Sequence, residues 1–236
     1  MGHLHILKYA HQHGCPWDED VFREAAVNCK LDALMYLHEN GCPWGPLVSA
    51  AAARRGRLDI LKYLHENGCP CNEEVFRAAA KCGTLRILML SHEIGCPWNE
   101  MTCRNAARKG RLDALKYLHE NVCPWDQRTC SAAASGGHLD ILKYAHELGC
   151  PWDAYACREA ASHGKLEILK YLHEHGCPWN SDTSHAAGRY NRVEMLKYLQ
   201  EKGCPGWEDY FDGENLLDQQ SDESTSGEES DWDYLI

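Results

Sequence analysis

The sequence predicts an all-α helical solenoid, and three observations indicate this fold class. A Cys-Pro dipeptide recurs every 27 residues, with its cysteine at positions 15, 42, 69, 96, 123, 150, 177 and 204. Between these dipeptides, apolar residues recur at the three- and four-residue spacing of amphipathic helices, and glycines separate the helical segments. Repeats of about 20 to 50 residues are typical of solenoids, in which each unit buries its apolar face only against its neighbours.

The longer predicted helix of each unit is represented by LDILKYLHEN, which places Leu58, Leu61 and Leu64 on one face. Gly68 follows this segment, at the position where a left-handed residue ends a helix most easily. Glycine occupies this position in seven of the eight units, and Val122 occupies it in the other. Because a β-branched residue is costly in the left-handed conformation, we expect the turn at Val122 to be strained or differently built.

A shorter helix is predicted after each Cys-Pro-Trp segment. An Asp or Asn suited to capping its N-terminus comes next in six units: Asp18, Asn72, Asn99, Asp126, Asp153 and Asn180. The helix then contains an Ala-Ala pair such as Ala106–Ala107. These small side chains should let neighbouring helices approach closely.

The unit resembles an ankyrin repeat. DVFREAA, EVFRAAA and MTCRNAA match the T-P-L-H-x-A-A stretch of that family, and GHLDILKYAHELGCP matches G-H-L-E-I-V-K-L-L-L-E-x-G-A-D. The family repeat has about 33 residues, and the six that are missing here fall where ankyrin repeats project a β-hairpin finger. The resemblance implies a right-handed-type solenoid of about eight stacked helix-turn-helix units, with partners bound on the concave face lined by the short helices.

The chain divides into an array and an acidic tail. We expect residues 1–217 to form the array, with a first unit that lacks its short helix and a degenerate last unit, and residues 218–236 to be disordered. Met1 is followed at once by a long helix whose apolar face lacks a preceding unit, which suggests a truncated gene model or a fragment.

Charge is concentrated in the tail. Residues 208–236 contain eleven Asp and Glu and no Lys or Arg, whereas the rest carries 24 basic and 24 acidic side chains. Such a neutral body is not expected to bind nucleic acid or membranes, and no stretch is apolar enough to span a bilayer. The turns between short and long helices are basic, so we hypothesise that the tail folds onto that edge and competes with an anionic partner.

The recurring cysteines are assigned to the scaffold. One His and one Cys per unit are half of a tetrahedral zinc site, and packed helices lie about 8–10 Å apart, which is too far for equivalent cysteines to share a metal or a disulfide. Reduced, buried thiols would favour the cytoplasm or nucleus. The residues assigned a structural role are Cys15, Pro16, Trp17, Cys42, Trp44, Cys96, Trp98, Cys123, Trp125, Cys150, Trp152, Cys177 and Trp179.

The recurring histidines are interpreted as helix caps rather than ligands, because a cation in the last turn of a helix suits the helix dipole. They are His11, His38, His65, His92, His119, His146 and His173. No cofactor is expected. The chain contains no G-x-S-x-G elbow, phosphate-binding loop or H-E-x-x-H motif, and a single active site would not need eight copies of one nucleophile. We therefore predict that the chain is not an enzyme.

Recognition is expected where the units differ. Exposed positions of the short helices vary from unit to unit and include Arg, Met and Tyr, which are enriched at interfaces. The candidate partner-binding residues are Asp20, Arg23, Glu74, Arg77, Met101, Arg104, Arg128, Tyr155, Arg158, Asp182 and His185. The predicted function is a monomeric protein–protein interaction scaffold. Two alternatives stay open: a metal- or heme-binding repeat that uses the His and Cys-Pro positions, and the targeting fragment of a larger fused protein.

Overall fold

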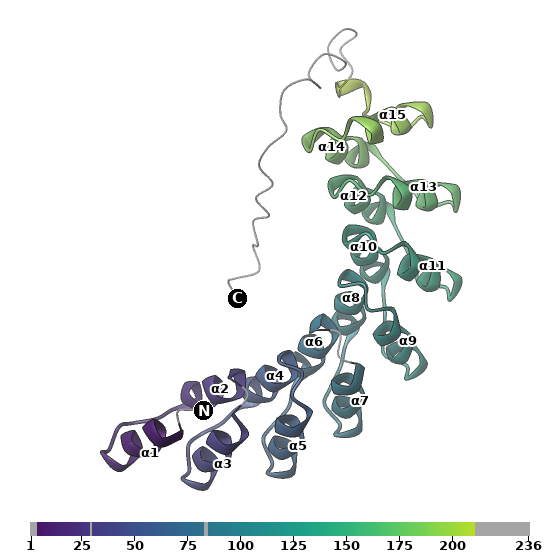
Figure 1. Cartoon of the computed structure of the whole chain (residues 1–236). Coiled ribbons are helices and arrows are strands. Elements are labelled where there is room, and N and C mark those ends of the chain that lie inside the picture. Colours follow the sequence, from purple (N-terminus) through teal and green to yellow (C-terminus); the bar gives the residue numbers. More distant parts are fainter. Residues whose placement is uncertain (1–3, 29, 83–84, 211–236) are drawn as a thin grey trace.

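The computed structural model describes residues 4–28, 30–82 and 85–210. These residues form fifteen α-helices and one 3₁₀ helix, and they contain no β-strand. The helices lie in two layers that follow an arc (Figure 1). The predicted all-α repeat architecture is therefore confirmed.

We call the helices on the convex side the outer helices and those on the concave side the inner helices (Figure 1). The outer helices are α1 (Leu4–Gln12), α3 (Leu31–Glu39), α5 (Leu58–Glu66), α7 (Leu85–Glu93), α9 (Leu112–Glu120), α11 (Leu139–Glu147), α13 (Leu166–Glu174) and α15 (Val193–Glu201). The inner helices are α2 (Glu19–Val27), α4 (Pro46–Arg54), α6 (Glu73–Cys82), α8 (Glu100–Arg108), α10 (Gln127–Gly136), α12 (Ala154–Ser162) and α14 (Ser181–Arg189). A 3₁₀ helix, η1 (Glu208–Tyr210), follows α15.

The predicted difference in helix length is wrong. The outer helices have nine residues each, and the inner helices have nine or ten. The predicted longer segment, LDILKYLHEN, included Asn67, which is the C-cap residue of α5 rather than part of the helix. The two classes differ in side-chain size rather than in length.

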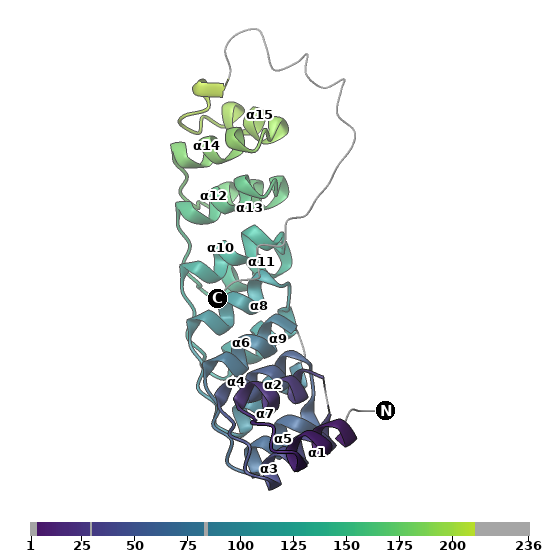
Figure 2. The same cartoon turned by 90° about the vertical axis from the view of Figure 1, so that its left-hand side faces the viewer.

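Side-chain size also explains the arc. The inner helices pack against one another through buried alanines such as Ala107 and Ala134, both fully buried, and they lie closer together than the outer helices do. The outer helices place Leu, Tyr and His between units, which holds neighbouring backbones apart. Figure 2 shows the resulting stack of helix pairs from the side. The array therefore bends with its small-residue layer inside.

One continuous core runs through the array. Each outer helix contributes a buried aliphatic face, such as Ile60, Leu61 and Leu64 of α5. Phe22 and Phe76 of the inner helices are fully buried and contact the tryptophans of the following units. Because each unit adds only part of this core, its burial depends on the next unit, as the sequence period predicts.

The caps follow the sequence prediction. The side chains of Asp18, Asn99, Asp126, Asp153 and Asn180 accept hydrogen bonds from backbone N–H groups in the first turn of their inner helices. Asn72 does the same for α6, accepting from the Glu74 N–H at 3.1 Å. One or two first-turn N–H groups of each of these six helices are thereby satisfied without a β-hairpin finger.

The turn at Val122 is strained rather than differently built. Val122 keeps a left-handed φ of 64°, close to the 72° of Gly41 at the equivalent position. Its N–H donates to the carbonyl of His119 as the glycines do in other units, and its side chain is 86% exposed. Hydrogen bonds on both sides hold the backbone in a conformation that valine disfavours.

None of the helices in the described part of the chain is long and apolar enough to cross a bilayer. Residues 218–236, which are the predicted disordered tail, lie outside the described residues, and so does the predicted boundary at residue 217.

Candidate partner-binding face

The exposed side of the inner helices is called the inner face. All eleven candidate partner-binding residues lie on inner helices, and each is exposed or half-buried: Asp20, Arg23, Glu74, Arg77, Met101, Arg104, Arg128, Tyr155, Arg158, Asp182 and His185. Candidates on the same helix, such as Asp20 and Arg23, are three residues apart, so they lie on adjacent turns of one helix face. The structure separates ten of them into three groups, and Met101 belongs to none of the three.

The first group lies on α2 and α6 and is paired internally. The Arg23 guanidinium lies 3.1 Å from the Asp20 carboxylate, and Arg77 forms the equivalent ion pair with Glu74. Exposed pairs of this kind contribute roughly 0.3–0.5 kcal/mol to stability. Their main consequence is electrostatic, because each arginine is offset by a carboxylate on its own helix.

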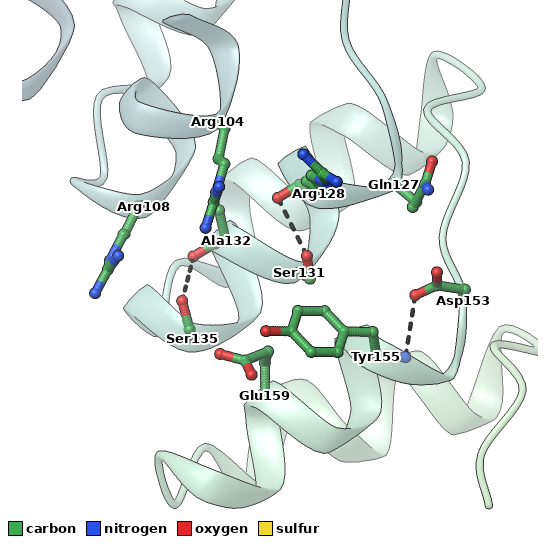
Figure 3. A pocket seen from close by; sticks show the side chains of 10 residues that line it. All are labelled: Arg104, Arg108, Gln127, Arg128, Ser131, Ala132, Ser135, Asp153, Tyr155 and Glu159. Carbon is green, nitrogen blue, oxygen red and sulfur yellow. Dashed lines mark hydrogen bonds between the residues drawn. The ribbon is translucent and has the colours of Figure 1, made fainter. Parts of the chain in front are cut away.

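The second group borders a hollow of about 710 Å³ over α8, α10 and α12 (Figure 3). Its floor is built by the small side chains Ser131, Ala132 and Ser135 of α10. Longer side chains from the neighbouring helices form its sides. The hollow exists because α10 carries Ser at the positions where α8 carries Arg104 and Arg108. Its full lining is Arg104, Arg108, Gln127, Arg128, Ser131, Ala132, Ser135, Asp153, Tyr155 and Glu159.

The arginines of this hollow are not neutralised within the described part of the chain. No ion pair joins Arg104, Arg108 or Arg128 to a carboxylate there. Arg104 instead donates a weak hydrogen bond to the Met101 sulfur at 3.6 Å. These guanidinium groups therefore keep donors that an acidic group could accept from.

The opposite side of the hollow is aromatic and acidic. The Tyr155 ring has the Arg158 guanidinium 5.0 Å from its centroid. Desolvation by burial, and then the nearby Glu159 carboxylate, raise the pKa of the Tyr155 hydroxyl. This hydroxyl therefore stays a neutral donor at physiological pH. The hollow thus offers arginine on one side and phenol and carboxylate on the other, without a nucleophile–base pair.

A smaller hollow of about 260 Å³ lies over α12 and α14. It brings Arg158, Asp182 and His185 together, with Arg189 beside them. His185 Nε2 also lies 3.1 Å from the Asp209 carboxylate of η1. The candidates Asp20, Arg23, Glu74, Arg77 and Met101 line neither of these two hollows.

Seven residues that line the larger hollow are not among the eleven candidates: Arg108, Gln127, Ser131, Ala132, Ser135, Asp153 and Glu159. Glu159 could have been found, because its position in the repeat holds Ala in the neighbouring units, at Ala132 and Ala186. Asp153 could not, because its residue type already fits the N-cap.

The comparison with solved structures agrees with the two-layer arrangement of repeated helix pairs. The crystal structure of the human ASB11 ankyrin repeat domain is similar to this chain, with a TM-score of 0.55 and 19% sequence identity. The similarity covers 66% of this chain and 84% of that chain. This chain has an ankyrin-type fold. No family model matches the sequence, and no curated protein matches it.

The histidines of this ankyrin-type array contact a tryptophan within their own unit and a tyrosine of the next unit. In six units the histidine ring of the outer helix stacks on the tryptophan six residues later, with centroids 3.7–4.3 Å apart. His38 Nδ1 also meets the Tyr63 hydroxyl of the next outer helix at 2.9 Å. We call each such His, Trp and Tyr set an aromatic junction. The histidines do lie in the last helical turn, but the sequence reasoning missed these partners.

The Cys-Pro cysteines also connect units. The Cys42 thiol donates to the carbonyl of Asp18, the N-cap residue of the preceding inner helix, at 3.3 Å. Cys123, Cys150, Cys177 and Cys204 make the same contact 24 residues upstream, at 3.3–3.5 Å. Burial, with a smaller contribution from Asp18, raises the pKa of Cys42 to about 11, so the thiol keeps the proton that it donates. The described residues contain no group of three His, Cys, Asp or Glu side chains placed to hold a metal ion.

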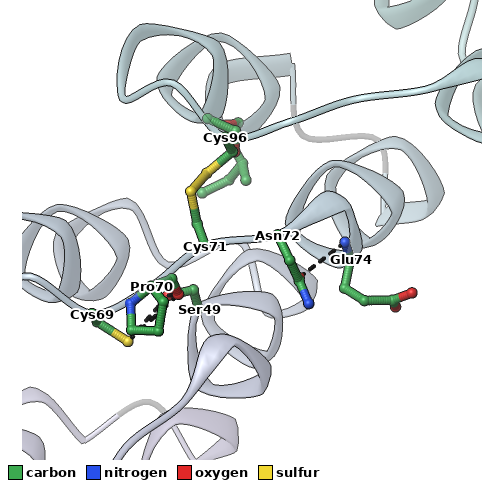
Figure 4. The surroundings of a disulfide bond; sticks show 9 residues. Ser49, Cys69, Pro70, Cys71, Asn72, Glu74 and Cys96 are labelled. Carbon is green, nitrogen blue, oxygen red and sulfur yellow. Dashed lines mark hydrogen bonds between the residues drawn. A yellow bond between two sulfur atoms is a disulfide. The ribbon is translucent and has the colours of Figure 1, made fainter.

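The prediction that adjacent units are not cross-linked is wrong at one place. Cys71 and Cys96 form a disulfide, with Cα atoms 5.5 Å apart (Figure 4). The prediction compared equivalent cysteines, but Cys71 occupies the tryptophan position of its unit. That position faces the next unit, close to its Cys-Pro cysteine. The inference of a reducing compartment assumed that no disulfide forms, and it loses that support.

Proposed function

We propose that the chain is a non-catalytic scaffold that binds a protein partner through the inner face. The observation that carries this proposal is the hollow over α8, α10 and α12. It is formed by residues that differ between units in an array whose pattern of helices repeats from unit to unit. The ankyrin-type fold supports the same conclusion, because arrays of this kind build extended concave binding surfaces.

The composition of the hollow fits a polar, partly acidic segment of a partner. Arg and Tyr are among the side chains that most often dominate the energy of protein interfaces. Arg104 and Arg128 can donate bidentate hydrogen bonds to carboxylates. Tyr155 is 45% exposed and adds apolar area beside them. The small floor of α10 leaves space for a side chain to enter between these groups.

Affinity capture with the intact chain tests the proposal. The test variant combines Arg104→Ala, Arg128→Ala and Tyr155→Ala, and we expect it to lose at least tenfold in affinity for a partner that the native chain retains. The matched control combines Lys62→Ala, Arg86→Ala and Met89→Ala, which removes two cations and one exposed apolar side chain from outer helices. Circular dichroism should show unchanged helix content in both variants. Equal affinity of the test variant and the control would contradict the proposal.

A further inference from the structure

The acidic C-terminal segment begins on the inner face. Residues Glu208–Tyr210 of η1 occupy the positions of the repeat where the inner helices of earlier units begin, such as Glu19–Val21 in α2. Asp209 already pairs with His185 of α14, with 3.1 Å between the carboxylate oxygen and Nε2. The chain therefore enters its acidic segment within the inner layer, beside the smaller hollow.

Tyr210 is seated on a glycine that replaces an alanine. The equivalent position is alanine in all six earlier inner helices: Ala26, Ala53, Ala80, Ala107, Ala134 and Ala161. At Gly188 an added β-carbon would overlap the Tyr210 ring. The φ of Gly188 is not positive, so the backbone of α14 does not require glycine, which costs about 1 kcal/mol in a helix relative to alanine. The close approach of Tyr210 is the contact that requires it.

The inner face beyond this point carries arginines without ion-pair partners in the described part of the chain. Helices α8, α10, α12 and α14 carry five arginines and three carboxylates, whereas α2, α4 and α6 carry four cations and five carboxylates. The arginines are Arg104, Arg108, Arg128, Arg158 and Arg189, and none has an ion-pair partner in the described part of the chain. Arginines that keep free hydrogen-bond donors for an acidic group therefore lie on the half of the inner face nearest to the acidic segment.

Residues 212–233 complement this charge. They contain nine Asp and Glu and no Lys or Arg. Adjacent packed helices lie about 8–10 Å apart, so three steps from α14 to α8 span about 30 Å. About ten extended residues cover that length. The segment is thus long enough to reach the hollow over α10 from its start at Tyr210.

We propose that residues 212–233 bind in cis to the arginines of α8 to α14 and compete with a partner for the inner face. The competition rests on the proposed function, whereas the cis binding does not. Asp209 places the start of the segment on the inner face rather than on the basic turns considered from the sequence alone. A partner then has to displace an acidic segment, so the affinity of the partner depends on salt and on the charge of this segment.

The first test uses the full chain and needs no partner. A protease that cleaves after glutamate is added at about 20 mM salt, and mass spectrometry follows cleavage after Glu214, Glu223, Glu228 and Glu229. We expect Arg104→Gln with Arg128→Gln to raise the cleavage rate at least threefold, and about 500 mM salt to do the same for the native chain. The matched control, Lys62→Gln with Arg86→Gln on outer helices, should leave the rate unchanged. Equal rates in all chains and at both salt concentrations would overturn the cis binding.

The second test uses the same full chain with its nine acidic residues between 212 and 233 changed to Asn or Gln. We expect this variant to bind the captured partner at least fivefold more tightly than the native chain at low salt, with the difference lost at high salt. If cleavage shows protection but the affinity does not change, the competition is wrong. If the hollow is not the binding site, the variant with Arg104→Ala, Arg128→Ala and Tyr155→Ala will capture the partner as well as the native chain does. That result would contradict the proposed function and would leave the cis binding untouched.

Discussion

Two neighbouring junctions of the array are built with different chemistry. Between α3 and α5, His38 stacks on Trp44 at 4.1 Å, and its Nδ1 meets the Tyr63 hydroxyl at 2.9 Å. Between α5 and α7, the equivalent positions hold His65, Cys71 and Leu90. The second junction thus has neither the tryptophan nor the tyrosine of an aromatic junction.

The second junction has a covalent bond instead. Cys71 bridges to Cys96 across the units, and Leu90 is buried with 7% exposure where other units place tyrosine. The one junction that lacks both the tryptophan and the tyrosine is thus the junction that has the disulfide. The comparison teaches that the repeat specifies positions facing each other across units, and that these positions accept more than one kind of contact.

The disulfide and an aromatic junction stabilise the array by free energies of similar size. A disulfide closing a loop of 25 residues stabilises by about 3.5 kcal/mol in the chain-entropy model. A ring stack contributes about 0.5–1.5 kcal/mol beyond its buried area, and a hydrogen bond adds about 1 kcal/mol. One bridge can therefore compensate for a missing aromatic junction.

The largest effect is expected from breaking the bridge. Cys71→Ser should lower the free energy of unfolding by about 3 kcal/mol, measured by urea denaturation followed by circular dichroism. Cys82→Ser is the control, because Cys82 is exposed and free. Adding a reductant to the native chain should reproduce most of the loss. A midpoint that is the same with and without reductant would show that the bridge does not stabilise this junction.

A smaller effect is expected from converting the bridged junction into an aromatic one. Cys71→Trp with Leu90→Tyr gives His65 the ring and hydroxyl partners that His38 has. This variant should be about 1–2 kcal/mol more stable than Cys71→Ser in the same denaturation experiment. Cys71→Trp alone is the control, because it lacks the tyrosine hydroxyl. A double variant no more stable than Cys71→Ser would mean that the backbone spacing here differs from that of the other junctions.

Removing one hydroxyl should weaken an aromatic junction modestly. Tyr63→Phe keeps the ring and removes the hydrogen bond to His38, so we expect a loss of about 1 kcal/mol. Tyr9→Phe is the matched control, since Tyr9 lies on the first outer helix and is 63% exposed. Differential scanning calorimetry compares the two variants with the native chain. Equal melting temperatures of the two variants would contradict a stabilising role for the hydrogen bond.

The smallest effect concerns the turn that positions an aromatic junction. Val122 lies between His119 and Trp125, which stack at 4.1 Å. Val122→Gly should relieve the left-handed strain and raise the free energy of unfolding by about 0.5–1 kcal/mol. Gly176→Ala is the reciprocal change, and it should lower stability by a similar amount. A β-carbon at Gly176 would meet no atom within 4 Å, so only backbone strain is tested. A lower melting temperature for Val122→Gly would refute this account.

Much of the fold could be predicted because its determinants are local. The 27-residue period, the Leu faces and the glycine turns are read within a few residues of sequence, and they specify helices, ends and stacking. The capping side chains of Asp18 and Asn180 contact backbone only two or three residues away. The strained turn at Val122 follows equally from one residue type at one backbone position.

Contacts between units could not be predicted, because they depend on the offset between adjacent helix pairs. His38 and Tyr63 are 25 residues apart, and no short-range pattern indicates that their side chains meet. The Cys71–Cys96 bridge was missed for the same reason, since only the stacked structure brings the tryptophan position against the next Cys-Pro cysteine. The hollow over α10 needs small residues on one helix and long ones on both neighbours. The sequence by itself determined the helices and their order. The tertiary structure decided which residues of different units touch, because that depends on the distance and rotation between units.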